Sequence, residues 1–131
     1  MDEPIWVRMD VVLAIHRRQL AEHGGDEGVR DRGLLESALA RPKNRLAYAG
    51  EDSDLAALAA CYAFAITNNH PFVDGNKRTA LAVFRTFLAL NHCDFNATQE
   101  EKYETFMDLA RGDLTEPQLA IWIRSHLSQE S

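Results

Sequence analysis

The 131-residue chain has little of what marks nucleic-acid binders, membrane proteins and secreted proteins. Only 14 Lys and Arg residues stand against 20 Asp and Glu residues, so the formal net charge is -6. Because binding to nucleic acid needs a basic surface that displaces counterions, we expect no general nucleic-acid binding, although a local basic patch stays open. The N-terminus MDEPIWVRMD lacks the basic-then-apolar layout of a signal peptide, and no run approaches the length of a membrane span. We therefore expect a cytoplasmic protein with no membrane partner.

Cysteine is scarce too. Cys61 and Cys93 lie in apolar surroundings and have no neighbour at metal-ligand spacing, so each is predicted to be a small buried residue rather than part of a disulfide or zinc site. Four histidines are scattered without a metal-ligand repeat and are predicted to be structural or surface residues: His16, His23, His92 and His126. The sequence gives no reason to expect a metallohydrolase.

Hydrophobic residues are plentiful at 46%, with 26% charged residues, which is typical of a soluble globular protein. A chain of this length has room for one core, so we predict a single domain over residues 1–131. Apolar residues recur at helical spacing in six stretches, and sustained alternation of period two is absent. The predicted fold is all-α, a compact six-helix bundle, with CDFNA as a brief extended stretch.

The first half of the chain contains clear stop signals. Residues 9–22 are predicted to form a helix that ends at Gly24 and Gly25. A second, short helix is expected after Asp31, with Pro42 ending its apolar pattern. The following segment RPKNRLAYAGED, residues 41–52, is predicted to be a loop or short flap before the central helix.

The second half contains four further helices. The central helix is expected to start with Ser53 as its N-cap and to be buried on most faces, because it is rich in alanine. The next apolar run follows a polar cluster and ends near Asn91. Capping boxes that begin at Thr98 and Thr115 predict the last two helices.

The polar cluster NNHPFVDGNKRTAL occupies residues 68–81, between two apolar helices. Its second half begins a helix, whose N-terminus carries unpaired N–H groups and partial positive charge. Gly75 lets an anion approach the backbone closely, Asn76 can orient one oxygen, and Lys77 and Arg78 supply cationic donors. The cluster therefore predicts a phosphate cradle. It is not a Walker P-loop, because the glycine spacing differs and no strand precedes it.

Two further residues complete a nucleotide-processing site. Asp74 offers a hard oxygen ligand that suits Mg²⁺ held by one carboxylate and phosphate oxygens. His70 can act as general base for phosphoryl-type transfer, because an imidazole can take up a proton at cellular pH. Phe72 is predicted to be a core anchor that positions the motif. Taken singly, His70 also fits a helix cap, and the two cations also fit ordinary solvated charges.

The string HPFVDGNKR, from His70 to Arg78, resembles the signature H-x-F-x-[DE]-[GA]-N-[KG]-R of the Fic/Doc (Fido) family. The resemblance extends to GVRDRGLLESAL and RLAYAG and so covers most of residues 24–90. NKRTAL is similar to the Doc (death on curing) branch, the toxins of type II toxin–antitoxin modules. The resemblance implies the Fido fold.

The resemblance also implies a role for each motif residue. His70 would activate a target hydroxyl, Asp74 would support Mg²⁺, and the nucleotide phosphates would be held by Gly75, Asn76, Lys77 and Arg78. Doc-like proteins transfer the γ-phosphate of ATP to a threonine of elongation factor Tu and so halt translation. A small Phd-like antitoxin is the implied partner, and the implied target-docking flap comprises Arg45, Leu46, Ala47 and Tyr48.

The motif departs from both branches of the family at specific positions. Lys77 stands where adenylyl-transferring Fic enzymes have glycine, and Leu81 stands where their pattern G-N-G-R-x-x-R has a second arginine. Asn68 and Asn69 stand where Doc has a basic residue before the histidine. The leading hypothesis is a phosphotransferase acting on Ser or Thr. The alternatives are a Fic-type adenylyltransferase and a catalytically weak binding module.

Overall fold

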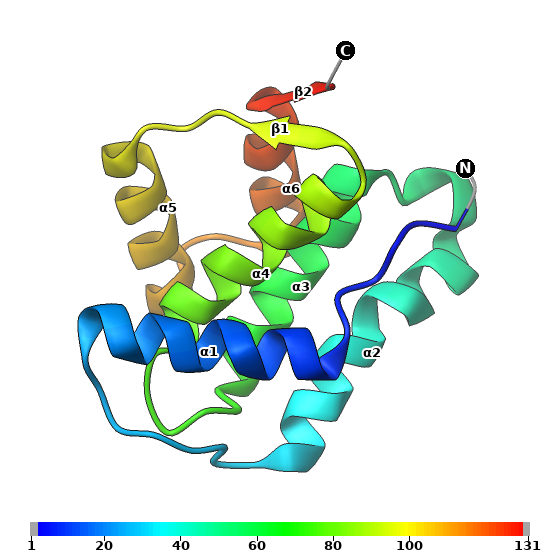
Figure 1. The fold of residues 1–131 in the computed structure, drawn as a ribbon. Helices are drawn as coiled ribbons and strands as arrows, with labels where there is room; N and C mark the ends of the chain where they lie inside the picture. Colours follow the sequence, from blue (N-terminus) through cyan, green and yellow to red (C-terminus); the bar gives the residue numbers. More distant parts are fainter. Residues whose placement is uncertain (1–2, 130–131) are drawn as a thin grey trace.

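The structure, a computed structural model, describes residues 3–129, which form six α-helices, one 3₁₀ turn and two short strands (Figure 1). In chain order the elements are α1 (Met9–His23), α2 (Arg32–Ala49), η1 (Gly50–Asp52), α3 (Leu55–Asn69), α4 (Asn76–Leu90), β1 (Cys93–Phe95), α5 (Gln99–Arg111), α6 (Glu116–Ser125) and β2 (Leu127–Gln129). The predicted all-α fold with six helices is confirmed. The single domain over residues 1–131 stays a prediction, and residues 1–2 and 130–131 lie outside the described range.

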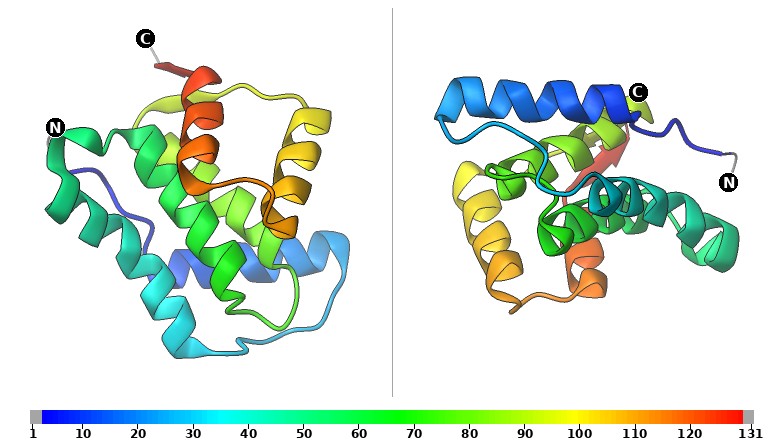
Figure 2. Two further views of the ribbon diagram at one scale, coloured as in Figure 1. Left: turned by 180° about the vertical axis from the view of Figure 1, so that it is seen from behind. Right: turned by 90° about the horizontal axis from the view of Figure 1, so that it is seen from below.

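Helix α3 runs through the middle of the molecule, in contact with α2, α4 and α6 (Figures 1 and 2). Its sequence LAALAACYAFAITNN is rich in alanine, and the helix is buried along most of its length. Small side chains let three neighbouring helices approach one axis closely while apolar surface is removed from water. Helix α1 contacts α4. The buried central helix is thus as predicted.

Helix α2 does not end at Pro42 but continues to Ala49 with this proline buried inside it. A proline within a helix removes one backbone hydrogen bond and crowds the preceding turn. Tertiary contacts hold the helix beyond it, because Arg41 and Arg45 both form ion pairs with Glu116 of α6, at 2.7 and 3.3 Å. The prediction that Pro42 ends the second helix is therefore wrong.

The predicted loop or flap over residues 41–52 is wrong for the same reason. Arg45, Leu46, Ala47 and Tyr48 belong to the last turns of α2. Leu46 packs against the core, which anchors this helical end, whereas Tyr48 is 96% exposed. The 3₁₀ turn η1 then leads to α3.

The N-cap of α3 is Asp54 rather than the predicted Ser53. The Asp54 carboxylate accepts a hydrogen bond from the Ala57 N–H at 2.8 Å, while Ser53 is buried and donates to the Arg45 carbonyl at 3.4 Å. A carboxylate at this position also suits the positive end of the helix. Arg124 of α6 contacts both Asp54 oxygens, at 2.6 and 2.9 Å, so the cap also ties two helices together.

The chain after α4 follows the sequence signals closely. The predicted extended stretch is confirmed as β1, which pairs antiparallel with β2, with Asp94 opposite Ser128. Both predicted capping boxes are present, beginning at Thr98 and Thr115. Strand β2 had no separate signal, because it is specified only by its pairing with β1.

Two loops far apart in the sequence lie side by side and position the polar cluster (Figure 1). The loop between α1 and α2 meets the loop between α3 and α4 in an isolated bridge of Val29 with Phe72. The Val73 N–H donates to the Gly28 carbonyl at 3.1 Å, and the Arg30 N–H donates to the Pro71 carbonyl at 2.7 Å. The conformation of the motif therefore depends on residues some 40 positions earlier in the chain.

Among the described residues, none of the helices combines the length and the apolar character that crossing a bilayer requires.

Candidate active site

His70 ends α3 in a left-handed conformation, with φ 51° and ψ 54°. Histidine visits this region more readily than most residues, but the position still needs support from its surroundings. Arg30 provides it, because its Nε donates to the His70 carbonyl at 2.7 Å and another guanidinium nitrogen donates to the Asn69 carbonyl at 3.0 Å. The imidazole of His70 is exposed and lines a cleft.

Asn76, the first residue of α4, holds the motif loop together from inside. Its Oδ1 accepts from the Phe72 N–H at 3.0 Å, and its Nδ2 donates to the Phe72 carbonyl at 3.0 Å. The same Nδ2 lies 3.2 Å from Nδ1 of His70. Asn76 is only 6% exposed. Its amide is therefore engaged within the loop and positions His70, and its predicted contact with a nucleotide phosphate stays a prediction.

These contacts also fix which nitrogen of His70 can accept a proton. The Phe72 N–H requires an acceptor, so Oδ1 of Asn76 faces Phe72 and Nδ2 faces the imidazole. Nδ1 of His70 must then be the acceptor, and a neutral ring carries its hydrogen on Nε2. The lone pair of the ring faces the start of α4.

Phe72 is fully buried and stacks on His16 of α1, with ring centroids 3.8 Å apart and an angle of 11° between the planes. Nε2 of His16 donates to the Asp74 carbonyl at 2.9 Å. His16, predicted to be structural or superficial, is thus a structural residue that supports the motif from beneath. A signal for this was present, since His16 lies at helical spacing between the buried residues Val12 and Leu20.

Asp74 is an exposed carboxylate whose geometry is set by backbone donors. Its Oδ2 accepts from the Asp26 N–H at 3.2 Å and its Oδ1 from the Gly75 N–H at 2.8 Å. These N–H groups, that of Asp26 first, lower the pKa of Asp74 below its ordinary value, so it is charged at neutral pH. Each oxygen retains a lone pair toward solvent, which fits Mg²⁺ shared with phosphates.

The site fits a metal ion held by protein side chains alone less well than one shared with phosphates. Within residues 3–129 there is no group of three or more His, Cys, Asp or Glu side chains that could hold an ion. Asp74 would therefore share a Mg²⁺ ion with phosphate oxygens and water, and its role as a ligand stays a prediction.

Gly75 has a structural role in the fold, independent of any ligand. Its φ of 76° is left-handed, and an added Cβ would lie 3.4 Å from Leu20 and 3.8 Å from His16. Glycine is thus required by backbone conformation and by packing against α1. The predicted reason for this glycine, room for a phosphate to approach the backbone, stays a prediction.

The remaining donors of the predicted cradle are available to a ligand. The first intrahelical bond of α4 joins the Thr79 N–H to the Gly75 carbonyl at 3.0 Å, so the first three N–H groups of the helix have no partner in α4. Lys77 and Arg78 are exposed beside them. Nζ of Lys77 lies 3.9 Å from Sδ of Met107, a weak contact that leaves its charge unpaired by acid among the described residues.

The cleft next to the motif has a volume of about 890 Å³ and lies between α1, α4 and α5. It brings together most of the predicted site residues, namely His70, Asp74, Gly75, Asn76, Lys77 and Arg78. The four residues of the predicted docking flap are not among those that line it. Their role in docking a target stays a prediction.

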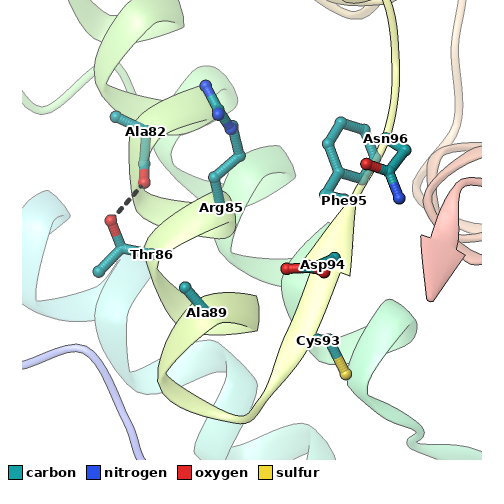
Figure 3. A pocket seen from close by; sticks show the side chains of 8 residues that line it. All are labelled: Ala82, Arg85, Thr86, Ala89, Cys93, Asp94, Phe95 and Asn96. Carbon is teal, nitrogen blue, oxygen red and sulfur yellow. Dashed lines mark hydrogen bonds between the residues drawn. The ribbon is translucent and has the colours of Figure 1, made fainter. Parts of the chain in front are cut away.

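Two cations of this cleft, Arg85 and Lys102, were missed by sequence reasoning. They lie on α4 and α5 at the end of the cleft away from the motif. With Lys77 and Arg78 they make a local basic patch on a chain of net charge -6. Arg85 also lines a neighbouring pocket of about 410 Å³, next to β1 (Figure 3).

Both cysteines are buried, as predicted. Burial raises the pKa of Cys61 to about 11, so this thiol stays protonated at neutral pH and supplies no nucleophile.

Comparison with known proteins agrees with the motif. The family model described as Fic/DOC family matches residues 6–88. The protein named "Protein kinase doc" from Escherichia phage P1 is 38% identical over 80 residues, which are 61% of this chain and 63% of the phage protein. "Toxin Doc" from Mycolicibacterium smegmatis (strain ATCC 700084 / mc(2)155) is 44% identical over 68 residues, 52% of each chain.

The chain thus spans about three fifths and about half of the length of these two relatives. The family match is longer than half of this chain and includes the whole polar cluster as well as the loop that contains Arg30. The chain therefore belongs to the Fic/DOC family.

Proposed function

We propose that the chain is a Doc-like toxin that transfers the γ-phosphate of ATP to a Ser or Thr hydroxyl of a protein. An elongation factor Tu-like protein is the proposed target, blocked translation the outcome, and a small Phd-like antitoxin the proposed inhibitor. The observation that carries the proposal is that His70 meets the cationic start of α4 in one cleft. The names of the two relatives, a protein kinase and a toxin, support it.

The reaction assigns one task to each group. His70 removes the proton of the target hydroxyl, whose oxygen attacks the γ-phosphorus. The bond from this phosphorus to the bridging oxygen of the β-phosphate breaks, and ADP leaves. Lys77, Arg78 and the first-turn N–H groups of α4 stabilise the charge on the transferred phosphoryl group.

The hydroxyl reaches the lone pair of His70 when the exposed imidazole turns away from Asn76 and the hydroxyl replaces Asn76 as its partner. The 3.2 Å separation between Asn76 Nδ2 and His70 Nδ1 is at the long limit for a hydrogen bond, so little is lost when it opens. Asn76 keeps its two 3.0 Å bonds to Phe72 and stays in place.

Asp74 is the residue that would hold Mg²⁺, together with phosphate oxygens of the nucleotide. When bound, the ion neutralises part of the phosphate charge that the cations of the cleft do not reach.

Lys77 and Leu81 favour phosphoryl over adenylyl transfer. Leu81 is half-buried in the cleft wall and brings no charge to the place where the resemblance puts the second arginine of adenylyl-transferring enzymes. Lys77 places a compact ammonium group where a transferred terminal phosphate develops charge. The nucleotide should bind with its γ-phosphate toward His70.

Labelled ATP tests this assignment. The purified protein, incubated with cell extract and Mg²⁺, should label a target from γ-labelled ATP and leave it unlabelled from α-labelled ATP. Label from the α position alone would establish the Fic-type adenylyltransferase instead. Nucleotide binding without label from either position would favour the binding module.

Histidine variants test the role of the base. His70→Ala should lower transfer by about 10²–10⁴-fold while the helical circular dichroism spectrum is kept. The matched control is His92→Ala, since His92 is also exposed with a positive φ, 63°, but lies in the turn after α4. Toxicity kept in a folded His70→Ala protein would refute the assignment.

A further inference from the structure

The cleft has a second cationic end that the proposed reaction does not use. Arg85 lies two helical turns beyond Arg78 on the same face of α4, a rise of about 10 Å. Lys102 of α5 lines the cleft beside it. Lys77 at the motif end of α4 lies 3.9 Å from Met107 in the later half of α5, whereas Lys102 lies in the first half of α5.

Lys102 is 92% buried, and within residues 3–129 no hydrogen bond or ion pair engages its ammonium group. Burial, and then the charge of Arg85, lower its pKa. The lowering is typical of a cation that lacks a compensating acid. Lys102 lies on the buried stripe of α5 with Phe106 and Leu109, so its stem packs in the core while its head reaches the cleft.

The acidic residues of the cleft are occupied elsewhere. Glu22 pairs with Arg18 at 2.9 Å, and Asp74 accepts from two backbone N–H groups. Arg85 extends beside Ala82, with its guanidinium away from Asp94 (Figure 3). It forms no ion pair in the described part of the chain. Two neighbouring cations without an acid are unfavourable unless an anion binds between them.

We propose that Arg85 and Lys102 form a second anion subsite, which receives a phosphate group of the bound polyphosphate chain at the end away from His70. The proposal rests on the proposed function for the identity of the ligand, a nucleoside triphosphate. Leu81 and Phe106 line the cleft between the two cationic ends, and low-dielectric groups there strengthen the attraction between the cations and a phosphate. The subsite would make affinity depend on the length of the phosphate chain.

Calorimetric titration with pyrophosphate, tripolyphosphate and ATP tests the subsite. The wild-type protein should bind tripolyphosphate more tightly than pyrophosphate. The ratio of the dissociation constant for pyrophosphate to that for tripolyphosphate should fall about tenfold in Lys102→Met. Methionine keeps the unbranched stem, so packing is retained. Arg85→Met should lower the ratio in the same way, and it should leave the stability of the fold unchanged because Arg85 is exposed. The matched control Lys43→Met, an exposed lysine of α2, should leave the ratio unchanged.

The outcomes separate this proposal from the proposed function. An unchanged ratio in both Lys102→Met and Arg85→Met would overturn the subsite, even with normal γ-phosphate transfer. A fallen ratio in a protein that binds tripolyphosphate but not ATP would support the subsite and refute the nucleotide-dependent function. Failure of the wild-type protein to distinguish tripolyphosphate from pyrophosphate would also overturn the subsite.

Discussion

Replacing Asn76 by alanine should destabilise the protein strongly, although the residue belongs to a motif predicted to bind phosphate. The Asn76 amide satisfies both the N–H and the carbonyl of Phe72, each at 3.0 Å, and Phe72 is fully buried. Asn76→Ala leaves both backbone groups without a partner inside the protein. Nothing else in the loop replaces these two hydrogen bonds, because the helix begins only at this residue.

The expected magnitude follows from these two groups. A buried backbone group that loses its partner costs about 1–3 kcal/mol, so two such groups cost about 2–6 kcal/mol. The better helix propensity of alanine offsets about 0.5 kcal/mol. The free energy of unfolding should therefore fall by roughly 2–5 kcal/mol, a large share of the stability of a domain of this size. With a typical m-value, the urea midpoint should fall by roughly 1–2 M.

Urea unfolding followed by circular dichroism measures this change. The matched control is Asn68→Ala, one residue from the end of α3, where the asparagine is exposed and its loss should change the free energy by less than about 0.5 kcal/mol. If Asn76→Ala were as stable as Asn68→Ala but unable to bind nucleotide, Asn76 would be a phosphate ligand. The positioning role argued above would then be refuted.

Two further predictions concern pH. The carboxylate of Asp54 has a lowered pKa, first because of Arg124, so its stabilisation is present above the ordinary value of 3.8 and is lost as pH falls through the lower folded value. Asn is also a good N-cap, so the stability lost in Asp54→Asn should shrink between about pH 5 and pH 3, and a constant loss would contradict the ion-pair contribution. His126 has a raised pKa, first because of the Trp122 carbonyl and then Glu101, so its stabilisation is complete below 6.5 and is lost as pH rises through the higher folded value. The stability advantage of the wild type over His126→Gln, measured by urea unfolding, should therefore be larger at about pH 6 than at about pH 8, and the opposite order would refute the assignment.

The helices of the second half could be predicted from the sequence because their signals are local. Each capping box that begins at Thr98 or Thr115 uses a residue only three positions away, and both form. The course of α2 could not be predicted this way. Its continuation beyond Pro42 depends on Glu116, more than 70 residues later in the chain, which pairs with arginines on both sides of the proline. Tertiary contacts here override a local stop signal.

In the candidate site, too, some features follow from local sequence signals and others depend on tertiary contacts. The motif from His70 to Arg78 contains the predicted catalytic and phosphate-binding residues, and the structure brings them to one cleft. The residues that hold the motif in place come from α1 and the loop after it, as His16 and Arg30 do. Arg30 has no periodic pattern that would reveal it, because its contact is with backbone carbonyls across a loop. Positioning residues of this kind are specified by three-dimensional proximity and not by spacing.

The net charge of the chain affects the binding of long polyanions, whereas the charge of the cleft affects the binding of small ones. A net charge of -6 argues against binding an extended polyanion, whose phosphates would meet acidic surface over most of the protein. A small polyphosphate would meet only this cleft, which is lined by Lys77, Arg78 and Arg85 of α4 and Lys102 of α5. A concave site with low-dielectric walls concentrates the field of these four cations. An acidic protein can thus favour a short polyanion over a long one, and this charge distribution suits the proposed nucleotide-dependent function.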